Sequence, residues 1–75
     1  MIDTTGRHPA TAHLARWLTV NPNLPIVGLD VADAVEGLAA ELVAALPDGP
    51  ELTAGLRHLL EAKDCFVRAA LEGRL

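Results

Sequence analysis

Two short proline-rich stretches divide this chain into three segments and limit what it can fold into. They are residues 21–25 (NPNLP) and residues 47–50 (PDGP). Proline lacks a backbone donor and restricts the residue before it, so a helix that reaches either stretch ends there. No segment shows the strict alternation of apolar and polar residues that is typical of a strand. The sequence therefore predicts an all-α chain.

Apolar residues recur at helical spacing in the first two segments. Pro9 suits the first position of a helix, and the helix predicted over residues 9–19 has an apolar face made of Ala10, Leu14, Trp17 and Leu18. Residues 20–27 are predicted to be an extended linker. In the second segment, a continuous stripe predicts a helix over residues 28–46 and consists of Val31, Val35, Leu38, Leu42 and Ala45.

The third segment predicts the longest helix, over residues 50–72, because Pro50 and Glu51 suit a first helical turn. The side chains expected to face its neighbour are Leu52, Leu56, Leu59, Phe66, Val67, Ala70 and Leu71. A short connection usually joins antiparallel neighbours, so we expect a short N-terminal helix followed by a long antiparallel two-helix hairpin. Residues 1–8 show no periodicity, and we expect an arm whose order depends on a partner.

A chain of 75 residues makes one small domain whose core needs reinforcement. One hydrophobic core of this size usually supplies only roughly 3–5 kcal/mol. The single cysteine, Cys65, has no partner for an intramolecular disulfide, and the cysteine and histidine spacing matches no structural zinc site. Small or apolar side chains lie on more than one face of the two long helices. We therefore expect a homo-oligomer.

The net charge of −4 argues against binding of duplex nucleic acid, because neutralising phosphates requires clustered cations. A local cationic pocket for a small anion is still compatible with this composition. The sequence shows neither a signal-peptide pattern nor an apolar run long enough to span a membrane. We expect a cytosolic protein that does not associate with membranes.

Lys63, the only lysine, is the most informative polar residue. It falls inside the apolar stripe of the third helix, where a cation lowers stability unless it reaches water, pairs with a carboxylate or meets an anionic ligand. Two interpretations remain open. One is an ion pair with Glu36, with Glu41 or with a carboxylate across a subunit interface, and the other is contact with an anionic ligand.

Two arginines of the same helix stand at i, i+4 spacing from a carboxylate, as Asp64 with Arg68 and as Arg57 with Glu61. This spacing is typical of a solvated, ion-paired helix face. The alternative is that both arginines bind phosphates while the carboxylates hold the guanidinium planes in place.

The histidines and the tryptophan also allow two interpretations. His8 either caps or packs against the first helix or contacts a ligand, and His8 and His13 are not at metal-ligand spacing. Trp17 either packs in the core or an interface or stacks on a base.

Two pairs of carboxylates stand one helical turn apart, Asp30 with Asp33 and Glu61 with Asp64. Helical magnesium-dependent nucleotide pyrophosphatases use this spacing, which makes an enzyme the third hypothesis. The signal is weak because caps and solvated helix faces often produce such pairs. We expect no catalytic residue, no metal and no cofactor.

Four stretches carry a resemblance to a known family. They are residues 7–14 (RHPATAHL), 23–25 (NLP), 46–52 (LPDGPEL) and 56–70 (LRHLLEAKDCFVRAA), the last being the strongest. Over residues 7–72 the chain resembles the helical-hairpin phage sponge proteins that counter the CBASS and Thoeris defence systems of bacteria.

This resemblance implies a homo-oligomer, commonly a hexamer, in the host bacterial cytoplasm. Its interface pockets would sequester cyclic dinucleotides, cyclic trinucleotides or cyclic ADP-ribose isomers without cleaving them. Family members often place a tyrosine or phenylalanine near the first helix to clamp a base, whereas this chain has no tyrosine, and His13 or Trp17 is the expected substitute. The expected ligand-binding residues are Arg7, His8, Pro9, His13, Trp17, Arg57, Lys63 and Arg68.

An interaction protein is the alternative to this sponge. A small phage regulator of this composition would bind a host protein through an exposed face of alanine and leucine side chains.

Overall fold

Three α-helices form the protein in the computed structural model, namely α1 (Pro9–Leu18), α2 (Ile26–Ala45) and α3 (Pro50–Glu72). The structure describes residues 2–21, 23 and 26–73, and it describes the backbone alone at residues 26 and 27. Within these residues there is no strand, so the predicted all-α class is confirmed. The first helix ends at Leu18 and the second begins at Ile26, two residues before its predicted start. Met1 of the predicted arm and residues 22, 24 and 25 of the predicted linker lie outside the described part.

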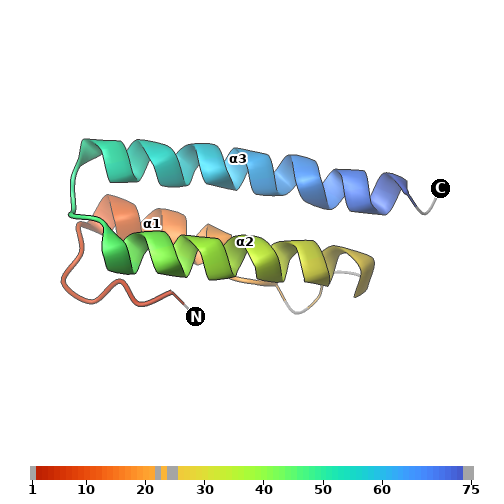
Figure 1. Cartoon of the computed structure of the whole chain (residues 1–75), viewed down its shortest axis with the longest axis horizontal. Coiled ribbons are helices and arrows are strands. Elements are labelled where there is room, and N and C mark those ends of the chain that lie inside the picture. The colour runs from red at the N-terminus through yellow and green to blue at the C-terminus, as the bar shows by residue number, and fades with distance from the viewer. Residues whose placement is uncertain (1, 22, 24–25, 74–75) are drawn as a thin grey trace.

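The two long helices, α2 and α3, lie side by side and run in opposite directions, and α1 packs against both (Figure 1). All three helices supply side chains to one core, because each has an apolar stripe that must be removed from water. The fully buried Leu18 of α1, Val43 of α2 and Leu56 of α3 are among the largest of these side chains. The other buried members of this cluster are Ile2, Leu14, Ala15, Val35, Ala39 and Leu52.

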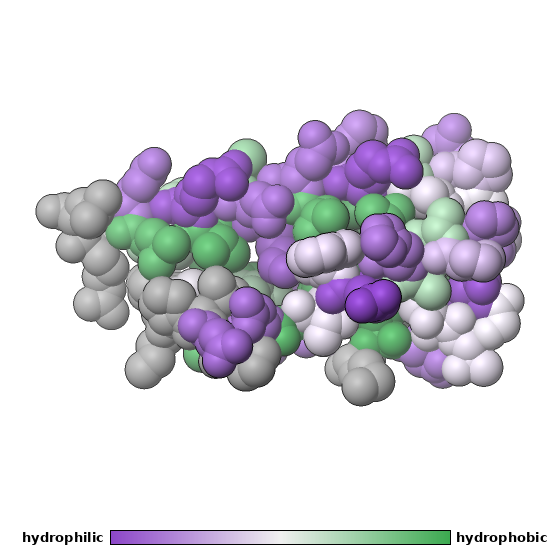
Figure 2. Space-filling model, turned by 180° about the vertical axis from the view of Figure 1, so that it is seen from behind, coloured by the Kyte–Doolittle hydropathy of each residue, from purple (hydrophilic) through white to green (hydrophobic). Residues whose placement is uncertain are grey.

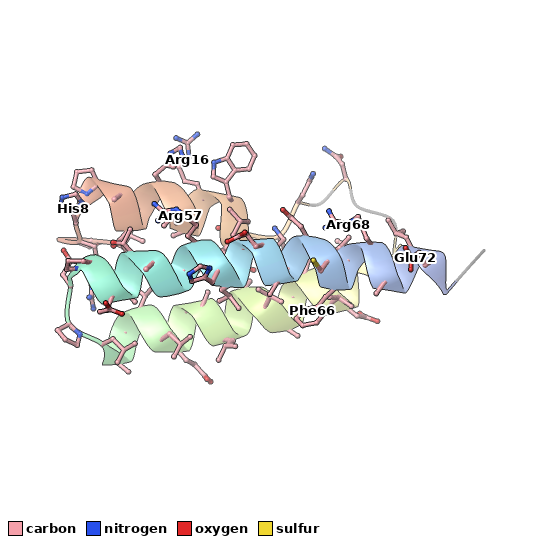
Figure 3. All side chains as sticks on the ribbon, turned by 90° about the horizontal axis from the view of Figure 1, so that it is seen from above. His8, Arg16, Arg57, Phe66, Arg68 and Glu72 are labelled. Atoms are coloured by element: carbon pink, nitrogen blue, oxygen red, sulfur yellow. The ribbon has the colours of Figure 1, made fainter. Side chains whose placement is uncertain are left out.

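The ten residues of α1 cover only one side of the α2–α3 pair. Apolar side chains on the uncovered side are therefore left in contact with water. Phe66 lies on the side of α3 toward its neighbour α2, as expected, but 55% of its surface is exposed (Figure 3). Leu38 and Leu46 are exposed in the same way. The predicted stripe of α3 is thus buried at Leu52 and Leu56 and open at Phe66.

The segment before α1 packs against its own chain. Ile2 is buried in the core, and the backbone N–H of Arg7 donates to the carbonyl of Thr4 to close a turn. Gly6 has a φ of 76° in this turn, a conformation that favours glycine. Hydrogen bonds from the hydroxyl and backbone N–H of Thr5 lower the pKa of the Asp3 carboxyl below its ordinary value. The expectation that residues 1–8 need a partner for their order is wrong for residues 2–8.

Arg7 closes the C-terminal end of α2. Its guanidinium donates to the carbonyl of Leu46 at 2.7 Å and to the carbonyl of Val43. The last carbonyls of a helix have no partner within the helix, and they carry the negative end of its dipole. A cation that donates two hydrogen bonds there satisfies both requirements.

Asp48, in the connection between α2 and α3, ties that connection to the start of α1. Its carboxylate accepts the backbone N–H of His8 at 2.9 Å and the hydroxyl of Thr11 at 3.4 Å. The ring Nδ1 of His8 in turn accepts the N–H of Ala10 and caps α1. The predicted capping interpretation of His8 is therefore confirmed.

Replacing Arg7 by methionine tests this arrangement. Arg7→Met should lower the free energy of unfolding by about 1.5–3 kcal/mol, because two carbonyls lose a charged donor. Arg57→Met is the matched control, since Arg57 is exposed and makes no recorded hydrogen bond or ion pair. Urea denaturation at one fixed protein concentration measures both variants. Equal stabilities of the two variants would contradict the role given to Arg7.

Candidate functional site

A pocket of about 470 Å³ lies between the C-terminal end of α1 and the second half of α3. One wall comes from α1 and the residues after it, and the other comes from α3. Its lining residues are Arg16, Trp17, Thr19, Val20, Asn21, Lys63, Asp64, Val67 and Arg68. Three of these side chains are cationic and one is a carboxylate, although the chain as a whole has a net charge of −4. This is the candidate site.

Lys63 is the buried member of the cationic group, with 8% of its surface exposed. Its ammonium donates a hydrogen bond of 2.6 Å to the backbone carbonyl of Trp17, near the end of α1. Neither of the carboxylates expected as partners, Glu36 and Glu41, forms an ion pair with it. In the described part of the chain, the charge of Lys63 therefore faces a carbonyl dipole and the pocket, with no carboxylate at ion-pair distance.

The backbone of Trp17 contacts Lys63 through this hydrogen bond, although the two residues are far apart in sequence. The side chain of Trp17 is 61% exposed. The prediction that Trp17 packs in the core of the chain is wrong. The short α1 buries Leu14, Ala15 and Leu18 instead, which directs Trp17 to the surface. An exposed indole at the edge of a cationic pocket offers a flat surface on which a base can stack.

Arg16 and Arg68 complete the cationic lining. Figure 3 shows Arg16 at the outer edge of α1 and Arg68 on the side of α3 toward α1. Arg68 was predicted to pair with Asp64, but its guanidinium instead contacts the sulfur of Cys65 at 3.5 Å. Arg16 was not among the predicted site residues. Its position next to Trp17, in the last turn of the first helix, is the sequence signal that could have identified it.

Arg57 lies on α3 outside the pocket that contains Lys63. It lines a second pocket of about 450 Å³ with His8 and Thr53, at the start of α3, and also a shallow groove between α1 and α3 with Pro9 and His13. Its predicted partner, Glu61, pairs with His58 at 3.2 Å instead. Among residues 2–21, 23 and 26–73, no carboxylate forms an ion pair with Arg57.

The predicted ligand-binding residues thus fall into three groups. Trp17, Lys63 and Arg68 share the candidate site. His8, Pro9, His13 and Arg57 line an adjoining surface between α1 and α3, which shares Trp17 with the candidate site. Arg7 is hydrogen-bonded to the end of α2.

Figure 2 shows the side of the molecule on which α1 lies, and hydrophilic side chains gather along the α3 edge with hydrophobic patches below them. The opposite face carries an apolar groove between α2 and α3, whose lining includes Val31, Leu38, Leu59 and Phe66.

The carboxylates required by the magnesium hypothesis do not converge. Over residues 2–21, 23 and 26–73, no group of three or more histidine, cysteine, aspartate or glutamate side chains is arranged to hold a metal ion. Glu61 is engaged with His58, and Asp64 lines the candidate site. The pairs predicted from spacing alone remain separate.

No helix in the described part of the chain has the length and apolar character needed to cross a lipid bilayer.

Comparisons with known protein families, with characterised proteins and with solved structures find no match to this chain.

Proposed function

We propose that this protein binds a small nucleotide that carries phosphate and holds it without cleaving it. The observation that carries the proposal is Lys63, a buried ammonium that faces a pocket and has no carboxylate partner in the described chain. Removing a cation from water is unfavourable unless another charge or dipole compensates. A phosphate in the pocket would supply that compensation.

The other lining residues fit the same ligand. Arg16 and Arg68 offer guanidinium groups, which bind phosphate oxygens through paired hydrogen bonds. Trp17 offers an exposed ring, and stacking of a base on an aromatic side chain contributes about 1–3 kcal/mol. Anion binding and base stacking together select a nucleotide over a simple inorganic anion.

The resemblance to phage sponge proteins narrows the ligand class to cyclic dinucleotides, cyclic trinucleotides or cyclic ADP-ribose isomers. Such a protein acts by mass action, because a bound messenger cannot activate the host effector. This mechanism requires tight binding and a high protein concentration, and it needs no catalytic group.

A homo-oligomer is part of this proposal. The groove between α2 and α3 exposes Leu38 and Phe66, and a second copy of the chain would bury them. Self-association would also reinforce a core that is small in a 75-residue chain. The helical hairpin formed by α2 and α3 is the proposed unit of assembly.

A second apolar pocket between α2 and α3, which shares Leu59 with that groove, favours the alternative function, a protein-interaction module. Its lining around Leu42, Leu46 and Leu52 is almost entirely apolar, with Glu51 and His58 at its edge. A partner helix with an apolar stripe fits such a groove. The two functions differ in whether the groove is covered by self-assembly or by another protein.

A thermal-shift panel tests ligand binding. We expect one cyclic nucleotide class to raise the melting temperature by several degrees or more, because ligand at about 100 times its dissociation constant adds roughly 2.7 kcal/mol. The panel contains cyclic dinucleotides, cyclic trinucleotides, cyclic ADP-ribose isomers and linear nucleotides with magnesium. Chromatography of the recovered ligand should show it unchanged. Conversion of a linear nucleotide would contradict the proposal and support the enzyme hypothesis.

Substitution of the pocket arginines locates the site. Arg68→Gln and Arg16→Gln should each weaken binding of the active nucleotide by about tenfold or more, because each removes a charged hydrogen bond. Arg57→Gln is the matched control and should bind as the wild type does, since Arg57 lies outside this pocket. Isothermal titration calorimetry measures all three. A loss confined to Arg57→Gln would move the site to the groove near the start of α1.

The assembly is tested by the dependence of stability on concentration. If subunits associate as they fold, the melting temperature should rise with protein concentration. Phe66→Gln should reduce this dependence and lower the sedimentation coefficient, because it places a polar amide in the groove that a second copy of the chain would bury. Glu72→Gln, a surface change near the end of α3, is the control. A monomer whose melting temperature does not depend on concentration would favour the protein-interaction module.

A further inference from the structure

The two walls of the candidate site come from elements that pack through apolar side chains but share few hydrogen bonds. The first wall is the C-terminal end of α1 with the residues after it, and it carries Arg16 and Trp17. The second wall is α3, which carries Lys63 and Arg68. Among the described residues, the bond from Lys63 to the Trp17 carbonyl is the only hydrogen bond recorded between these walls. The other polar contact between α1 and α3 joins Thr11 to Thr53 at the opposite end of α1.

The hydrogen bond from Lys63 to the Trp17 carbonyl lies in the last turn of α1 and stabilises that turn. The carbonyls in the last turn of a helix lack partners within the helix and carry its negative dipole. Thr19 satisfies one of them, because its N–H and its hydroxyl both donate to the carbonyl of Ala15. Lys63 satisfies another from a different helix. The ammonium thus fixes the last turn of α1 against α3, and with it the backbone that carries Arg16 and Trp17.

We infer that Lys63 is a positioning residue that couples occupation of the pocket to the docking of α1 onto α3. In the free protein, the bond from Lys63 holds α1 against α3, and the pocket lining has three cations and one carboxylate, Asp64. A bound anion would be attracted to the cations of both walls, so it would stabilise the docked state. Linkage requires the converse, namely that a protein with a docked α1 binds the anion more tightly. The second half of this inference depends on the proposed anion binding, whereas the first half does not.

Amide hydrogen exchange in the last turn of α1 tests the first half. In Lys63→Met, the amide of Thr19 should exchange at least about tenfold faster than in the wild type, because the charged hydrogen bond is lost. The amides of Val43 and Leu56 should keep their protection. Lys63→Arg, which retains a charged donor, should restore slow exchange at Thr19. Arg68→Met is the matched control, because it removes a pocket cation that makes no bond to α1.

Two outcomes would overturn the positioning role. One is unchanged exchange at Thr19 in Lys63→Met, and the other is an equal acceleration at all amides, which would indicate loss of global stability alone. If Lys63→Met does not fold, Lys63→Gln replaces it, because the glutamine amide is polar but carries no charge. Faster exchange confined to the α1 amides of Lys63→Gln would support the positioning role, and exchange at Thr19 identical to that of the wild type would overturn it.

Inorganic pyrophosphate is the probe for the second half. It should slow exchange at Thr19 in the wild type and have a smaller effect in Lys63→Met. No effect on the wild type, combined with fast exchange in Lys63→Met, would overturn the coupling to the anion while leaving the positioning role supported. An equal effect on both proteins would show that the anion acts independently of Lys63 and would also overturn the coupling. Failure of the proposed nucleotide function is thus distinguishable from failure of the positioning role.

Discussion

The backbone carbonyls at the C-terminal ends of helices need partners, and in this protein two cations from distant parts of the chain provide some of them. Arg7 binds the end of α2 and Lys63 binds the end of α1. Each contact connects an element to a helix that is remote in sequence, so each acts both as a cap and as a tertiary contact. The position of α1 in the structure depends on these contacts as well as on its few buried side chains. With α1 in place, one side of the α2–α3 pair is covered and the other is open.

The distribution of charge follows from this arrangement. The α2 helix carries four carboxylates and no cation, whereas the described cations lie on α1, on α3 and in the segment before α1. An acidic chain can therefore still present a cationic pocket. Of the three cations in that pocket, Lys63 has the most restricted side-chain position, because it is buried and hydrogen-bonded to the end of a helix. Arg16 and Arg68 have no comparable constraint and are freer to contact a ligand.

Local sequence rules are sufficient to predict where the helices lie in the chain, but they do not predict the contacts between the helices. Proline punctuation and helical periodicity predict three helices, and the position of Lys63 on the helical wheel predicts its burial. The partner of Lys63 could not be predicted, because a carbonyl is present at every residue and its availability depends on where α1 ends. The partners of Arg7 could not be predicted for the same reason. They lie 36 and 39 residues away in sequence, and such separations carry no periodic signal. Trp17 and Phe66 belong to the predicted apolar faces of their helices and are nevertheless exposed, since periodicity shows which residues share a face but not which face is covered.

The role of Lys63 as a cap does not compete with a role in binding an anion. An ammonium has three donors, and its recorded hydrogen bond to the Trp17 carbonyl uses one of them. A carbonyl dipole also compensates a full positive charge only in part, so the charge of Lys63 still favours an anion at the pocket. A carboxylate partner such as Glu36 or Glu41 would have neutralised the ammonium and removed this preference. Because the fold places a carbonyl there instead, the interaction that docks α1 also preserves the electrostatic attraction of the site.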